Sequence, residues 1–188
     1  MKVKGFSFIE ISMVLGLMAI AAAGVLALSK STTEDILGLR IIQEMQTVGH
    51  AAESMSGMLW NKAGDVTPLI QKYGGLPSEM VQGTTIKSPE GFNITVSIYS
   101  IAGKKQLRVS YSTSSSAVCR SFIGNLSDVI NGNSNVYIWN GGTYRILYNV
   151  HSAVPVDSTI LSSNICNRGD VPNAYRFLMD RDFDLVAP

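Results

Sequence analysis

The sequence predicts an α+β fold in which one long N-terminal α-helix packs against a head built on an antiparallel β-sheet. The segment Ile11–Ser29 is apolar and carries no charged residue. Apolar residues then recur at spacings of three and four through Glu34–Trp60, which is the periodicity of an amphipathic helix. The rest of the chain contains segments of alternating apolar and polar residues separated by glycine turns, and this pattern is typical of β-hairpins.

The first thirty residues predict a membrane-spanning helix. At about 1.5 Å per residue, a helix over the uncharged segment is long enough for a hydrocarbon core of about 30 Å. Lys2 and Lys4 precede it, so the short N-terminal segment is expected to stay cytoplasmic and the head to be exported. Two ordinary interpretations are a signal peptide cleaved near Ala21–Ala23 and a plain uncleaved anchor. Neither explains Glu10, a carboxylate at the edge of the apolar helix that costs about 2.5–3.5 kcal/mol on insertion scales.

A third interpretation takes the residues before the apolar helix as one motif, Lys4-Gly5-Phe6-Ser7-Phe8-Ile9-Glu10. This motif and the helix after it resemble the N-terminus of a type IV prepilin. The resemblance implies that a prepilin peptidase cleaves between Gly5 and Phe6, usually followed by N-methylation, and that the helix is retained. It also implies that Glu10 pairs with the freed amino group of Phe6 on a neighbouring subunit, which would neutralise both charges in a low-dielectric bundle.

The resemblance divides the chain into a leader (1–5), a transmembrane and filament-core helix (6–30) and an exported α+β head (31–188). It implies a single-pass inner-membrane protein that enters an extracellular filament, with further copies of the chain and the pilus assembly machinery as partners. A host-cell or cell–cell receptor is a further candidate partner.

The elements of the head are expected from local patterns. The amphipathic helix is Glu34–Trp60, and Asn61–Gly91, rich in glycine, proline and polar residues, is expected to be a connecting loop. The remaining predicted elements are a hairpin of Phe92–Tyr99 and Gln106–Tyr111, a helix over Ser116–Ile130, a hairpin of Val136–Trp139 and Tyr144–Tyr148, a short helix over Asp157–Ile165 and a strand over Ala174–Met179.

The two cysteines, Cys119 and Cys166, are too few for a four-thiolate zinc site and too far apart for a C-x-x-C redox motif. On their own they allow one disulfide or two free thiols, and export to an oxidising compartment suits a disulfide. The segments around both cysteines resemble the disulfide-bearing segments of type IVb pilins, which implies that they are joined. The cleavage site before Phe6, in contrast, resembles that of type IVa pilins.

Other candidate sites have simpler explanations. His50 and His151 lie in no recognisable ligand spacing, and His50 is expected on a helix surface. Asp180, Asp182 and Asp184 alternate and would share one face of a strand, where they could attract calcium. A solvated acidic edge is the favoured interpretation of these three residues, so no metal or other cofactor is expected.

Composition and motifs favour a structural protein. Of 188 residues, 46% are hydrophobic and 15% charged, and the formal net charge is +1. This composition excludes a mainly disordered chain, and so small a net charge does not support nucleic-acid binding by bulk charge. No G-x-S-x-G, H-E-x-x-H or P-loop motif occurs. The expected function is that of a type IV pilus subunit, not an enzyme, serving adhesion, colonisation, conjugation or aggregation. The alternatives are a minor pilin, a secretion-system pseudopilin, and a membrane-anchored exported enzyme or binding domain.

Overall fold

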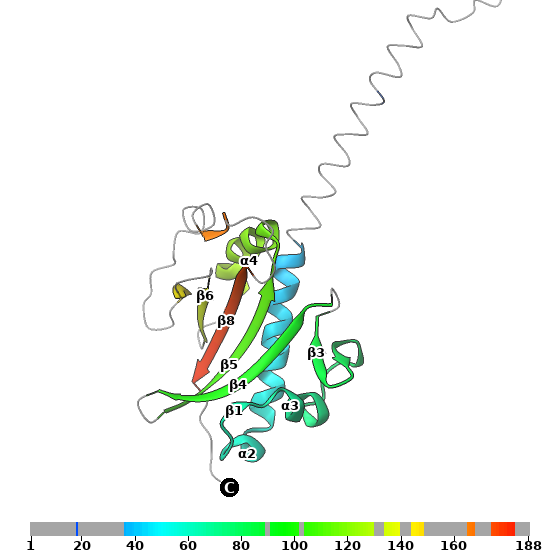
Figure 1. Ribbon diagram of the computed structural model, residues 1–188, viewed down its shortest axis with the longest axis vertical. Coiled ribbons are helices and arrows are strands. Elements are labelled where there is room, and N and C mark those ends of the chain that lie inside the picture. Colours follow the sequence, from blue (N-terminus) through cyan, green and yellow to red (C-terminus); the bar gives the residue numbers. More distant parts are fainter. Residues whose placement is uncertain are drawn as a thin grey trace, which may run out of the picture.

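The computed structural model describes residues 18, 36–88, 91–101, 104–129, 134–139, 144–148, 165–167 and 174–182. These residues form an α+β fold with one antiparallel sheet (Figure 1), which confirms the predicted class of the head. The predicted short helix over 157–165 lies outside them, apart from its last residue.

A helix over residues 36–54 runs along one face of the sheet (Figure 1). Its stripe of Ile41, Met45, Val48 and Ala52 is fully buried in the hydrophobic core. A turn at residue 55 separates this helix from the short helix α2 (Ser56–Leu59). The helix predicted from the spacing of apolar residues is therefore confirmed over its described part.

The sheet has the strand order β2-β3-β4-β5-β8-β6-β7, in which β2 is Val81–Gln82 and β3 is Thr85–Lys87. A further strand, β1 (Gly64–Asp65), pairs with β4, and every pairing is antiparallel. Both predicted hairpins are confirmed, as is the last strand, which is longer than predicted. β8 inserts between the two hairpins, pairing with β5 on one side and β6 on the other. The strands of this part of the sheet are β4 (Asn93–Ile101), β5 (Lys104–Thr113), β6 (Ser134–Trp139), β7 (Tyr144–Tyr148) and β8 (Tyr175–Asp182).

The prediction of an irregular loop over Asn61–Gly91 is wrong. This segment contains β1 (Gly64–Asp65), α3 (Thr67–Tyr73), the 3-10 helix η1 (Ser78–Met80), β2 (Val81–Gln82) and β3 (Thr85–Lys87). Proline in the first turn of α3 is compatible with the helix, because the amide hydrogen it lacks has no helical partner there. Ile70, Met80 and Ile86 are buried, so a few apolar anchors order a segment whose composition is that of a loop.

Helix α4 (Ser116–Val129) confirms the predicted second helix of the head. The Ser115 hydroxyl accepts a hydrogen bond from the Val118 amide at 3.3 Å, which caps its first turn. Phe122, fully buried, stacks on Phe177 of β8 with ring centroids 3.8 Å apart.

Gly38 lies where the 36–54 helix and α4 approach each other closely. A Cβ atom there would lie 2.6 Å from the Phe122 amide nitrogen and closer still to Ser121. Because these neighbours include backbone atoms, the two helices would have to move apart to admit a methyl group. We expect Gly38→Ala to lower the free energy of unfolding by about 1–3 kcal/mol, despite the higher helix propensity of alanine.

Gly124→Ala is the matched control for this prediction, because it lies in α4 and a Cβ there meets nothing within 4 Å. It should raise the free energy of unfolding by about 0.5–1 kcal/mol. Urea denaturation of both variants measures the difference. A Gly38→Ala chain as stable as Gly124→Ala would show that the close approach is unimportant.

Candidate functional site

Three of the five site residues predicted from the sequence, Gly5, Phe6 and Glu10, lie outside the described residues, as does His151. The structure therefore says nothing of the cleavage site or of the proposed charge pair. Of the predicted membrane-spanning segment, it describes only Met18. The other two site residues, Cys119 and Cys166, are described and adjacent.

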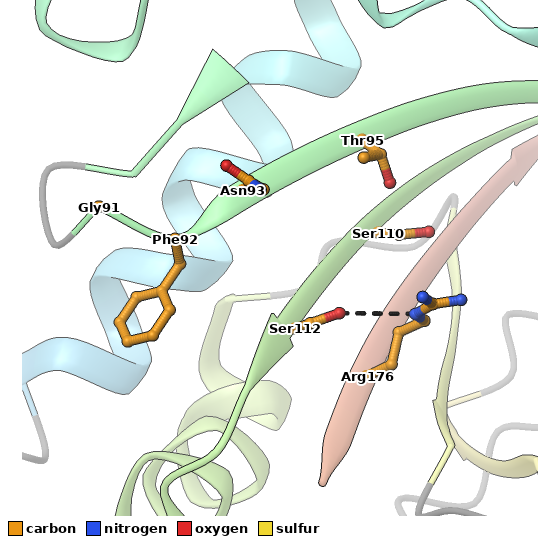
Figure 2. A pocket seen from close by; sticks show the side chains of 7 residues that line it. All are labelled: Gly91, Phe92, Asn93, Thr95, Ser110, Ser112 and Arg176. Carbon is orange, nitrogen blue, oxygen red and sulfur yellow. Dashed lines mark hydrogen bonds between the residues drawn. The ribbon is translucent and has the colours of Figure 1, made fainter. Parts of the chain in front are cut away.

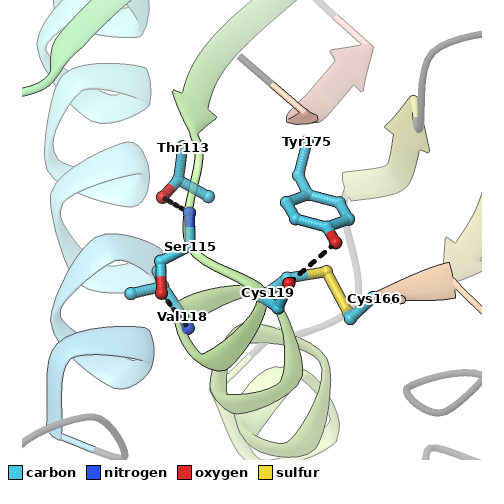
Figure 3. The surroundings of a disulfide bond; sticks show 7 residues. Thr113, Ser115, Val118, Cys119, Cys166 and Tyr175 are labelled. Atoms are coloured by element: carbon cyan, nitrogen blue, oxygen red, sulfur yellow. Dashed lines mark hydrogen bonds between the residues drawn. A yellow bond between two sulfur atoms is a disulfide. The ribbon is translucent and has the colours of Figure 1, made fainter. Parts of the chain in front are cut away.

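Cys119 and Cys166 form a disulfide, as predicted (Figure 3). Cys119 lies in α4 and Cys166 in the short segment 165–167, with their Cα atoms 5.7 Å apart. Both are buried, with exposures of 0% and 1%. A second link holds α4 to the sheet, because the hydroxyls of Ser116 and Tyr175 are hydrogen-bonded at 3.0 Å (Figure 3). The disulfide thus anchors a segment distant in sequence to the helix that covers one end of the sheet.

The prediction of a solvated acidic edge is wrong for Asp180, which is 2% exposed. Its two carboxylate oxygens accept hydrogen bonds from Arg108 Nε and Nη2, both at 2.7 Å, and Oδ2 also accepts one from the Tyr99 hydroxyl. The reason is the strand register, which places Asp180 of β8 directly opposite Arg108 of β5. The side chain of Asp182 and all of Asp184 lie outside the description.

Tyr99, Arg108 and Asp180 form a compact electrostatic unit on the sheet face opposite the 36–54 helix. The Arg108 guanidinium lies 4.4 Å from the Tyr99 ring centroid and donates to its hydroxyl at 3.1 Å. Burial, followed by the hydrogen bond to Asp180, raises the pKa of Tyr99. The hydrogen bond to Asp180 raises the pKa of Arg108. Both shifts favour the protonated forms of Tyr99 and Arg108 at neutral pH, and the hydrogen bonds of this unit hold β4, β5 and β8 together.

A second ion pair lies under the 36–54 helix. Arg181 Nη1 donates to Glu53 at 2.9 Å, and Arg181 Nε donates to the Ser134 hydroxyl at 3.0 Å. Gly49 lies beside this guanidinium, where a Cβ would be in ordinary van der Waals contact with Arg181 Cζ at 3.4 Å. His50 is exposed, as predicted, and its Nδ1 lies 3.0 Å from Glu53. The contact between Arg181 and Glu53 fastens the helix to the sheet. Sequence patterns did not predict it, because the two residues are 128 positions apart.

A polar hollow of about 340 Å³ opens on the same sheet face as Asp180 (Figure 2). Its lining is Gly91, Phe92, Asn93, Thr95, Ser110, Ser112 and Arg176. Hydroxyl groups of β4 and β5 and the Arg176 guanidinium of β8 lie on one side of the sheet around it (Figure 2). The sequence did not predict this hollow, because its lining comes from β4 and the two residues before it, from β5 and from β8, and the order of these strands was not predicted.

The part of the chain that the structure describes contains no group of three or more His, Cys, Asp or Glu side chains placed to hold a metal ion. Within the same residues, no helix has both the length and the apolar character needed to cross a membrane. No protein-family model, curated protein or solved structure matches the chain. Its function must therefore be inferred from its own residues and their geometry.

Proposed function

We propose that this chain is a structural subunit of a type IV pilus-like filament. The observation that carries the proposal is the motif from Gly5 to Glu10 placed directly before the uncharged segment Ile11–Ser29. A glycine followed by an apolar residue suits a protease that needs an extended, closely approached backbone. A lone carboxylate at the start of an apolar helix requires a partner once it leaves water.

The packing of the 36–54 helix on the sheet supports this proposal. Residues 36–54 bury one apolar stripe against the sheet, and this described part of the helix follows the uncharged segment closely in the sequence. Ile36, the first residue of that part, is an apolar side chain that is 59% exposed. The head is therefore compatible with a filament in which the N-terminal apolar segment packs against the same segment of other subunits. The disulfide between α4 and residues 165–167 suits a protein displayed outside the cell.

In the proposed assembly, cleavage after Gly5 frees the amino group of Phe6. The apolar helices then leave the membrane and pack against one another, so that protein neighbours replace lipid. Glu10 of one subunit neutralises the Phe6 amine of the next and fixes their axial register. Each contact joins two different surfaces of the subunit, so assembly propagates as a helix instead of closing into a ring.

Glu10→Ala tests this mechanism. We expect cleavage between Gly5 and Phe6 to proceed normally and incorporation into filaments to fall about tenfold or more, because the Phe6 amine would be buried without its partner. Mass spectrometry of the membrane fraction reports cleavage, and quantification of the sheared surface fraction reports incorporation.

Glu79→Ala is the matched control, because Glu79 is an exposed carboxylate in η1. It should leave both cleavage and filament yield unchanged. Abundant filaments built from Glu10→Ala would rule out the register role of the charge pair.

A further inference from the structure

The hollow described above lies on a row of polar side chains that crosses the sheet on the face away from the 36–54 helix. Ser112 of β5 is paired with Arg176 of β8, and Arg176 is paired with Trp139 of β6. Ile94 pairs with Tyr111, which places Asn93 beside Ser112 at the other end of the row. Directly opposite side chains on one sheet face are about 5 Å apart. Four neighbouring strands thus present an amide, a hydroxyl, a guanidinium and an indole in sequence.

The polar groups around the hollow are available to a ligand. The Thr95 and Ser110 side chains form no hydrogen bond among the described residues. Arg176 is exposed, and among the described residues it has one long hydrogen bond, from Nε to the Ser112 hydroxyl at 3.5 Å (Figure 2). Two other arginines of this sheet, Arg108 and Arg181, are instead held by carboxylates.

The charge of the hollow is positive. No acidic residue is among those that line it, and Lys87 of β3, paired with Asn93, adds a second cation at the edge of the row. Lys87 forms no ion pair within the described part of the chain. An unpaired guanidinium among hydroxyls binds a carboxylate through charge-assisted, two-pronged hydrogen bonds.

Trp139, the aromatic residue next to Arg176, indicates which class of anion the hollow would bind. Trp139 does not line the hollow, but it is half-buried and lies opposite Arg176 on the next strand, so it places an apolar side chain next to the hollow. A bare inorganic anion would use the guanidinium and the hydroxyls and leave the indole unused. A neutral sugar would leave the charge unused. A sugar that bears a carboxylate uses all three, since its hydroxyls match Thr95 and Ser110 and its apolar face matches the indole.

We propose that this hollow binds a carboxylate-bearing sugar residue, of the uronic acid or sialic acid class, with Arg176 as the carboxylate ligand. A volume of about 340 Å³ suits one such residue, since small-molecule sites start at about 300 Å³. All the residues involved lie in the head, so this binding does not require that the chain form filaments.

Saturation-transfer NMR tests the proposal on the whole chain in detergent micelles, with glucuronic acid and N-acetylneuraminic acid as separate probes and glucose and acetate as controls. We expect at least one sugar acid to bind more tightly than either control, and the two probes to distinguish the two sugar classes. Arg176→Gln should weaken that binding about tenfold to a hundredfold, the effect of losing a charge-assisted hydrogen bond. Arg120→Gln, an exposed arginine of α4, should not change it.

A second measurement decides the matter even if Arg176→Gln fails to fold. In a Trp60→Phe chain, Trp139 is the sole tryptophan, and the sugar acid should change its fluorescence while glucose and acetate should not. Failure of both sugar acids to bind, or acetate binding as tightly as they do, would overturn the proposal. A chain that binds the sugar acid but forms no filaments would overturn the proposed function alone.

Discussion

Replacing both cysteines by alanine is expected to lower the free energy of unfolding of the head by about 4 kcal/mol. The disulfide joins residues separated by 47 positions, and closing a loop of that length restricts the unfolded chain by this amount in the chain-entropy description. Alanine avoids placing new hydroxyls at two positions that are 0% and 1% exposed. Urea denaturation followed by the fluorescence of the two tryptophans measures the change.

The reduced wild-type chain is the control for this prediction. It keeps both sulfur atoms but lacks the bond, so its stability should fall close to that of the double variant. If the reduced chain were as stable as the oxidised chain, the bond itself would contribute nothing, and any loss in the variant would come from packing.

Arg108→Met is expected to lower the free energy of unfolding by about 3–5 kcal/mol, the usual effect of leaving a buried charge without its partner. Asp180 is 2% exposed and receives two 2.7 Å hydrogen bonds from Arg108. After the substitution, the Tyr99 hydroxyl still donates a hydrogen bond to Asp180. One neutral donor does not compensate for the burial of a charged carboxylate. The same urea denaturation measures the loss.

The double variant Arg108→Met/Asp180→Leu provides the matched control. It removes both charges and replaces them with apolar side chains, so it should recover most of the stability lost by Arg108→Met. If the two variants were equally unstable, lost packing of Arg108 on the Tyr99 ring would explain the effect, and the charge pair would not.

Local sequence patterns predicted those helices and strands of the head in which buried residues recur at a regular spacing. The strand β5 alternates buried and half-buried residues, with Leu107, Val109 and Tyr111 facing the core. The hairpins followed from such alternation and from short glycine turns, because both signals lie within a few residues of each other. The 36–54 helix followed from its buried stripe in the same way.

What the sequence could not predict depends on distant residues. The insertion of β8 between β5 and β6 is a choice among strand orders that local patterns do not distinguish. That insertion decides that Asp180 meets Arg108 and that Arg176 lies between Ser112 and Trp139. The error over Asn61–Gly91 has a different cause, since its short elements depend on pairing with β4 and on a few buried side chains.

The most direct test of the filament proposal is the intact mass and N-terminal sequence of the chain recovered from native membranes and from sheared cell surfaces. We predict a chain that begins at Phe6, with or without a methyl group, and lacks two hydrogens at Cys119 and Cys166. Its recovery in quantity from the sheared fraction would favour a major pilin over a minor pilin or pseudopilin. A chain that begins near Gly24 would contradict the proposal, because an ordinary signal peptidase would then have removed the helix on which assembly depends.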